Sequence, residues 1–221
     1  MIASLEQFQE YIEKGLIDEE NIRYEQIGNV IYLMSVPTEE HESIVGEVYT
    51  QFRNYFRGKF CQAYTSNTGL DLFNKVSLLR ELEEFQIYFK GKLDKGSENI
   101  YLLPDIEVIC DRSKGLFGKN GYKGVPKLIV EVLSSGTADK DLKEKLKIYE
   151  FIGVSEYWII KDIRNVSVYL LDGETKRYIK TEYTLDSLEN NFLYQKNVLD
   201  IPVKSFEGLT INLDEKIFNF G

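Results

Sequence analysis

The hydrophobic residues of this chain form helical stripes and unbroken apolar runs, which together predict an α/β (α+β) fold. Apolar residues at helical spacing predict helices at residues 4–20, 38–56 and 139–152, and a short helix at 76–84. Alternating or continuously apolar segments predict a hairpin at residues 23–34 and strands at 60–73, 85–89, 100–110, 128–133, 156–161, 166–171, 177–183 and 209–213. Thr38 stands directly before one helix and is its expected N-cap.

The order of three of these segments predicts how two strands pair. Residues 128–133, 139–152 and 156–161 form a strand, a helix and a strand in succession, which implies a right-handed crossover and parallel pairing. The chain has 221 residues and shows neither an internal repeat nor an obvious linker. We therefore expect a single domain over residues 1–221, with residues 1–21 as a helical appendage.

Composition and charge narrow the class of protein. With 43% hydrophobic and 29% charged residues, the chain is expected to fold around a sizeable core. The net charge of −9 argues against a protein that coats nucleic acid nonspecifically, because phosphate contacts require lysine and arginine. It does not exclude a nuclease, since bound metal ions and a local basic rim outweigh the net charge near a site.

The cysteines, the N-terminal residues and the lengths of the apolar runs indicate the cellular compartment in which the protein is expected. Cys61 and Cys110 give no disulfide framework, so we expect two buried, reduced thiols in a cytoplasmic protein. The first residues lack the basic start and the apolar core of a signal peptide. No apolar run approaches the ~20 residues that a membrane span requires, so no membrane association is expected.

Two carboxylates stand in segments that are otherwise apolar. Asp105 follows Pro104 at the start of one apolar run, and Glu131 lies within residues 128–133 among Leu, Ile and Val. Burying an ionised carboxylate costs free energy unless a cation, hydrogen bonds or a raised pKa compensates. A divalent metal on neighbouring strands would compensate both, and an all-oxygen site fits Mg²⁺ or Mn²⁺ better than Zn²⁺. The backbone carbonyl of Val132 is a further candidate ligand.

The helix at residues 139–152 supplies a candidate cation. Lys145 falls in the middle of the apolar stripe of this helix, whereas its other lysines point away from the stripe. Asp141 lies four residues earlier and is placed to orient the ammonium group. A lysine next to a metal-bound water positions or deprotonates that water, which suits hydrolysis of a phosphodiester.

Two residues of the helix at 38–56 are accessory candidates, and each has a structural alternative. His41 is the only histidine and is either a core residue with a backbone partner or a neighbour of the metal site. Glu47 is either a solvated surface acid or a further metal ligand. The main candidates have alternatives too: Asp105 as a strand-entry cap, and Glu131 with Lys145 as a structural ion pair.

Short motifs surround these residues, namely Arg23-Tyr24-Glu25, Ser35 and Pro37 before His41, Pro104-Asp105, Gly124-Val125-Pro126, Val130 to Ser134, Asp141, Lys145, Tyr149, Gly153-Val154, Glu156-Tyr157-Trp158 and Phe206 to Leu209. Together they resemble the Uma (Uma-two) family of restriction endonucleases within the PD-(D/E)XK nuclease superfamily, and the resemblance covers about residues 22–218. The superfamily expects a lysine at the position of Leu133. The resembled family supplies it from the following helix, which corresponds to Lys145.

The resemblance implies a restriction-endonuclease-like core with a mixed central sheet flanked by helices, preceded by the N-terminal helix and hairpin. It also implies a Mg²⁺- or Mn²⁺-dependent endonuclease acting on DNA, with Asp105, Glu131 and Lys145 as catalytic residues, and a homodimer. Two alternatives remain: a catalytically inactive nuclease-fold module that binds nucleic acid or a protein partner, and a metal phosphodiesterase acting on RNA.

Overall fold

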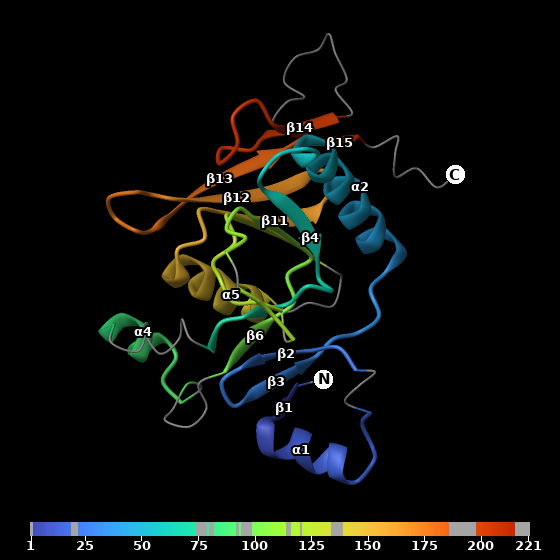
Figure 1. Cartoon of the computed structure of the whole chain (residues 1–221), viewed down its shortest axis with the longest axis vertical. Helices are drawn as coiled ribbons and strands as arrows, with labels where there is room; N and C mark the ends of the chain where they lie inside the picture. The colour runs from blue at the N-terminus through green and yellow to red at the C-terminus, as the bar shows by residue number, and fades with distance from the viewer. Residues whose placement is uncertain are drawn as a thin grey trace. The chain divides into compact units, whose positions relative to one another are not determined.

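The structure, a computed structural model, forms two compact units that alternate along the chain (Figure 1). It describes residues 2–18, 22–73, 79, 82–91, 93, 99–113, 116–119, 121–133, 139–185 and 198–214, except the side chains of residues 2 and 139–142. One unit comprises Met1–Val36, Asn67–Leu103 and Arg112–Gly124, and the other comprises Pro37–Ser66, Pro104–Asp111 and Val125–Gly221. The expectation of one domain stays a prediction.

The first unit is built on a seven-stranded sheet. Its strands, in spatial order, are β1 (Ile2–Ser4), β3 (Val30–Leu33), β2 (Tyr24–Ile27), β6 (Ile100–Leu102), β5 (Leu70–Asp71), β9 (Gly121–Tyr122) and β8 (Phe117–Gly118). The predicted hairpin at 23–34 is confirmed as β2 and β3. Only β5 and β9 pair in parallel among these strands.

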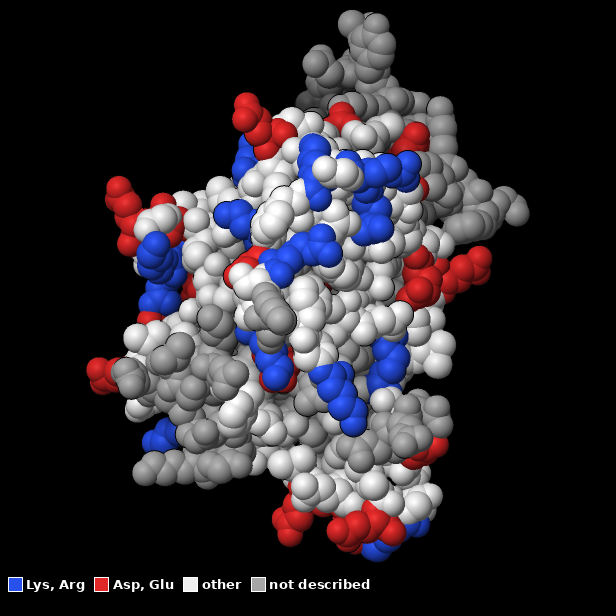
Figure 2. Space-filling model, in the orientation of Figure 1, with Lys and Arg blue, Asp and Glu red and all other residues white. Residues whose placement is uncertain are grey.

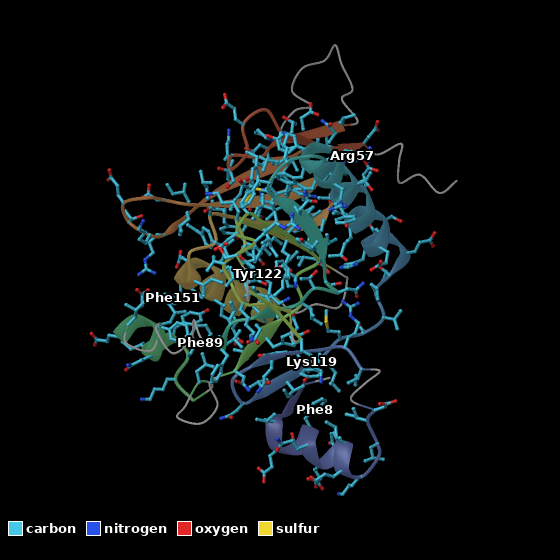
Figure 3. All side chains as sticks on the ribbon, viewed as in Figure 1. Phe8, Arg57, Phe89, Lys119, Tyr122 and Phe151 are labelled. Carbon is cyan, nitrogen blue, oxygen red and sulfur yellow. A yellow bond between two sulfur atoms is a disulfide. The ribbon has the colours of Figure 1, made fainter. Side chains whose placement is uncertain are left out.

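Two helices of the first unit differ from the prediction. Helix α1 (Leu5–Glu13) is shorter than expected and follows a strand. It carries Phe8, labelled in Figure 3, and the ring centroids of Phe8 and Tyr24 are 5.0 Å apart. The strand predicted at 85–89 is wrong, because these residues fall largely in helix α4 (Glu83–Tyr88). Phe85 and Phe89 are four residues apart, which places their side chains on the same face of a helix. Their ring centroids lie 4.7 Å apart, so this pair supports a helix and not a strand. Most of the helix predicted at 76–84 lies outside the described residues.

The second unit is built on a six-stranded mixed sheet. Its spatial order is β13 (Tyr178–Thr184), β12 (Asn165–Leu171), β11 (Glu156–Asp162), β10 (Leu128–Val132), β7 (Ile106–Ile109) and β4 (Gln62–Thr65). Strands β10 and β11 are parallel, and helix α5 (Asp139–Ile152) lies between them in the chain, which confirms the predicted parallel pairing. A separate hairpin, β14 (Val198–Pro202) and β15 (Thr210–Asp214), completes the unit, and β14 was not predicted.

Helices α2 and α5 lie on opposite faces of this sheet (Figure 1). Helix α2 (Glu39–Phe56) begins after Thr38, whose hydroxyl accepts a hydrogen bond from the N–H of His41 at 3.2 Å, so the predicted N-cap is confirmed. Its apolar stripe packs against the face that includes Val130 and Val132. Because side chains alternate along a strand, Glu131 faces the other side, toward α5.

Residues 100–110, predicted as one strand, form two strands in two different sheets. Strand β6 pairs in the first unit, and β7 pairs in the second. Pro104 lies between them, and it cannot donate to a sheet ladder because it lacks an N–H. This break places Asp105 directly before β7 rather than inside a continuous strand.

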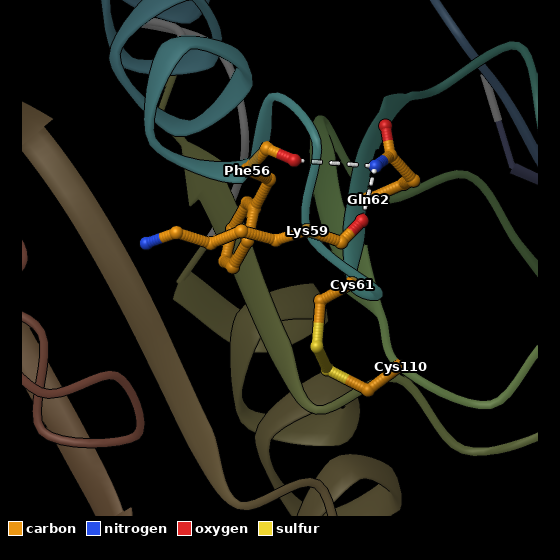
Figure 4. Close-up of a disulfide and its surroundings, with 5 residues drawn as sticks. All are labelled: Phe56, Lys59, Cys61, Gln62 and Cys110. Carbon is orange, nitrogen blue, oxygen red and sulfur yellow. Dashed lines mark hydrogen bonds between the residues drawn. A yellow bond between two sulfur atoms is a disulfide. The ribbon is translucent and has the colours of Figure 1, made fainter.

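The prediction of two reduced thiols is wrong, because Cys61 and Cys110 form a disulfide (Figure 4). The antiparallel pairing of Gln62 with Ile109 places the two cysteines opposite each other at the ends of β4 and β7. Their Cα atoms are 4.2 Å apart. The sequence does not reveal this pairing, because the residues are 49 positions apart. No described helix is both long and apolar enough to cross a membrane.

Candidate active site

The antiparallel pairing of β7 with β10 brings the two predicted acids together. Ile106 pairs with Val130, so Asp105 and Glu131 occupy adjacent positions on neighbouring strands. The Oδ2 atom of Asp105 accepts a hydrogen bond from the N–H of Val132 at 2.8 Å. Both carboxylates are buried, with 9% and 5% of the residue surface exposed, so each needs compensation.

Lys145 reaches Glu131 from helix α5. Its Nζ donates to Glu131 Oε1 at 3.0 Å, and only 8% of Lys145 is exposed. The hydroxyl of Tyr149, one helical turn later, donates to the same oxygen at 2.9 Å. The inward-facing lysine was predicted from the sequence, whereas Tyr149 was not predicted to belong to the site. Its spacing of four residues from Lys145 was the signal that could have identified it.

His41 lies beside Asp105, at the start of helix α2. Its Nε2 is 3.2 Å from Asp105 Oδ2, so the partner of this histidine is a carboxylate and not a backbone group. The hydrogen bond with Asp105 is the main cause that raises the pKa of His41, with burial acting against it. Asp105 Oδ2 therefore receives two contacts, from His41 and from Val132.

Three predicted residues remain, namely Glu47, Asp141 and Val132. Glu47 accepts a hydrogen bond from Gln51 Nε2 at 2.8 Å, and Gln51 also donates to the carbonyl of Asn212 on β15. Asp141 belongs to helix α5, but its side chain lies outside the described residues. The contact of Val132 with Asp105 uses its N–H. Its carbonyl points to the same side, because both groups of a strand residue face the same neighbour.

Glu107 is a buried acid that was not predicted from the sequence. It lies two residues after Asp105 on β7, opposite Ile129 and Tyr64, and is 0% exposed. Neither of its carboxylate oxygens has a hydrogen-bond partner within the described part of the chain. Burial raises its pKa to about 8. Like Glu131, Glu107 is a carboxylate inside an apolar run, and this pattern was the signal that could have identified it.

The donor set fits a hard divalent cation. Among the described residues, no three His, Cys, Asp or Glu side chains lie close enough together to hold a metal ion. Mg²⁺, however, usually binds through one or two carboxylates and keeps several waters. Asp105, Glu131 and the carbonyl of Val132 supply oxygens of this type, and these side chains come from neighbouring strands of one sheet.

Comparisons with known proteins agree with this architecture. The sequence model of the Uma2 family, described as "Putative restriction endonuclease", matches residues 5–202. The crystal structure of "a putative nuclease belonging to DUF820" from Anabaena variabilis ATCC 29413 matches with a TM-score of 0.61 and 16% sequence identity, covering 98% of this chain and 97% of that chain. At this identity the match shows the fold alone, and it confirms the expected mixed α/β class. No curated protein matches the chain.

Proposed function

The chain belongs to the Uma2 family of restriction-endonuclease-like proteins, and on that premise we propose that it is a metal-dependent endonuclease that hydrolyses DNA phosphodiester bonds. One observation carries the proposal: two buried acids and one buried lysine, from three separate segments of the chain, lie within one hydrogen-bonded group. Asp105 contacts the N–H of Val132, and Lys145 contacts Glu131. A purely structural ion pair would require Glu131 and Lys145 but not Asp105.

Each residue has a role in this reaction. Asp105, Glu131 and the carbonyl of Val132 would hold the divalent ion. When bound, Mg²⁺ or Mn²⁺ supplies positive charge that lowers the pKa of water and stabilises the pentavalent phosphate. Lys145 would orient the attacking water and stabilise the developing negative charge. The water oxygen forms a bond to phosphorus as the bond from phosphorus to the leaving oxygen breaks. The attacking water loses one proton to solvent and the leaving oxygen takes up one from solvent, so the products are a phosphomonoester and an alcohol.

His41 and the surface charge support the same proposal. His41 donates to Asp105 Oδ2 and so holds the orientation of that carboxylate. Despite the net charge of −9, Figure 2 shows several lysine and arginine side chains over the upper region, where helix α2 and strands β11 to β13 lie in Figure 1. Lysine and arginine side chains on a surface attract a phosphate backbone. The implied homodimer and the cytoplasmic compartment stay predictions.

The test is cleavage of supercoiled plasmid and of single-stranded DNA with Mg²⁺ or Mn²⁺. Glu131→Gln is expected to lower cleavage by more than about 100-fold, since even residues that only hydrogen-bond to metal ligands are worth about 10–100-fold. Glu174→Gln, an exposed acid in the turn between β12 and β13, is the matched control and should cleave like the wild type. EDTA should abolish cleavage. Equal nicking by the wild type and Glu131→Gln would reject the assigned site.

A second candidate function is a nuclease-fold module that binds nucleic acid or a protein without cleaving. The observation that favours it is the ion pair itself, because Lys145 already neutralises Glu131 at 3.0 Å. Calorimetric titration with Mn²⁺ separates the two functions, since a binding module does not require the metal. A panel of DNA and RNA substrates separates a deoxyribonuclease from an RNA phosphodiesterase.

A further inference from the structure

We propose that Tyr149 is a positioning residue for the active site, an inference that rests on the proposed nuclease function. Its hydroxyl and the Lys145 ammonium both donate to Glu131 Oε1, at 2.9 and 3.0 Å. Two donors on one oxygen restrict rotation of the carboxylate. Tyr149 thereby sets the direction in which Glu131 faces a divalent ion.

The position of the lysine explains why a second donor is needed. A lysine two residues after Glu131 would be held by the strand itself, but that position is Leu133. Lys145 instead comes from a helix, whose rotation about its axis and shift along the sheet must be fixed by other contacts. Lys145 and Tyr149 are one helical turn apart and meet the same oxygen, so together they fix both the rotation and the shift.

Tyr149 is itself held rigidly enough for this role. It is 0% exposed, and its ring meets that of Tyr157 on β11 edge-on, with ring centroids 5.0 Å apart. Its backbone carbonyl accepts hydrogen bonds from Gly153 at 3.2 Å and Val154 at 3.0 Å, where helix α5 ends. Gly153 has a φ of +87°, which a glycine adopts without strain. The ring, the hydroxyl and the backbone are thus all engaged.

Tyr149→Phe tests the inference because it removes only the hydroxyl and keeps the ring contact. Tyr178→Phe is the matched control: the Tyr178 hydroxyl donates to the carbonyl of Val154 at 2.9 Å, and its ring also contacts Tyr157, with centroids 6.4 Å apart. Each variant loses one tyrosine hydroxyl from the same aromatic cluster, together with the hydrogen bond described above for that hydroxyl. Only Tyr149→Phe loses a contact with Glu131.

Mn²⁺ affinity from calorimetric titration is the first readout, and steady-state cleavage is the second. Tyr149→Phe is expected to weaken Mn²⁺ binding by about 10–100-fold, the usual effect of removing a group that orients a metal ligand. It should lower kcat with KM little changed, because the hydroxyl contacts Glu131 and not the DNA. Tyr178→Phe should keep the wild-type values for both.

The outcomes separate this inference from the proposed function. If the wild type binds Mn²⁺ and cleaves, and Tyr149→Phe matches Tyr178→Phe in both readouts, the positioning role is overturned and the nuclease function stands. If the wild type neither binds Mn²⁺ nor cleaves, both are overturned. If Tyr149→Phe differs in stability from the wild type, the rise in Tm caused by Mn²⁺ is measured for each variant relative to its own Tm without the metal. This rise reports Mn²⁺ binding separately from the stability of the metal-free variant.

Discussion

Replacing Glu107 with glutamine should remove a large pH dependence from the stability of the metal-free protein. Burial raises the pKa of Glu107 from 4.5 to about 8, and its two oxygens have no partner within the described residues. Between these pH values the folded protein keeps a proton that the unfolded chain has released. Stability therefore falls as pH rises through this window; the penalty is absent below pH 4.5 and complete above about pH 8.

The magnitude follows from the size of the pKa shift. One pKa unit corresponds to about 1.4 kcal/mol, so raising the pH from 5 to 7.5 should lower the unfolding free energy of the wild type by about 3 kcal/mol through this group alone. Glutamine has nearly the same shape and does not titrate. Its unpaired amide costs free energy at every pH, so the slope with pH is the informative quantity and not the absolute stability.

The assay is urea unfolding of the wild type and Glu107→Gln in EDTA at several pH values. Glu156→Gln is the contrasting variant. Glu156 is also fully buried, but it accepts hydrogen bonds from Trp158 Nε1 at 2.8 Å and from the N–H groups of Lys204 at 3.2 Å and Ser205 at 2.6 Å. That substitution should destabilise by about 1–3 kcal/mol by disrupting these bonds. Parallel stability curves for the wild type and Glu107→Gln would refute the reasoning.

Three further predictions concern stability. Lys145→Met should lower the unfolding free energy by about 3 kcal/mol in urea titrations, because it removes one partner of a buried ion pair, and adding Glu131→Gln should restore part of the loss. Reduction of the Cys61–Cys110 disulfide should lower the unfolding free energy of the protein by about 4 kcal/mol, because the bridge restricts the unfolded chain across 49 positions. Scanning calorimetry should show one two-state transition, because the chain passes between the two units five times and neither is a continuous segment.

Each of these predictions has a contrary result. An unchanged unfolding free energy in Lys145→Met would mean that the ion pair contributes nothing, and full additivity in the double variant would mean that the two residues are uncoupled. A melting curve insensitive to dithiothreitol, with free thiols demonstrated chemically, would contradict the stabilising bridge. Two resolved calorimetric transitions would contradict a single cooperative domain.

Local pattern is sufficient to assign the faces on which Glu131 and Lys145 lie. A carboxylate within Leu128–Val132 must point away from the face that Val130 and Val132 share, because side chains alternate along a strand. Likewise Lys145 lies on the apolar stripe of its helix because of the helical period. The parallel pairing of β10 and β11 was predictable from the strand–helix–strand order, because an intervening helix returns the chain to the same edge of the sheet.

The partners of those residues depend on tertiary structure. His41 and Asp105 are 64 positions apart, and the N–H of Val132 reaches Asp105 across 27 positions. The sequence by itself determined that Asp105, Glu131 and Lys145 are charges in apolar segments that require compensation. Only the folded sheet decided what compensates each one, because a local period specifies a face whereas a contact depends on which distant strand or helix packs against it.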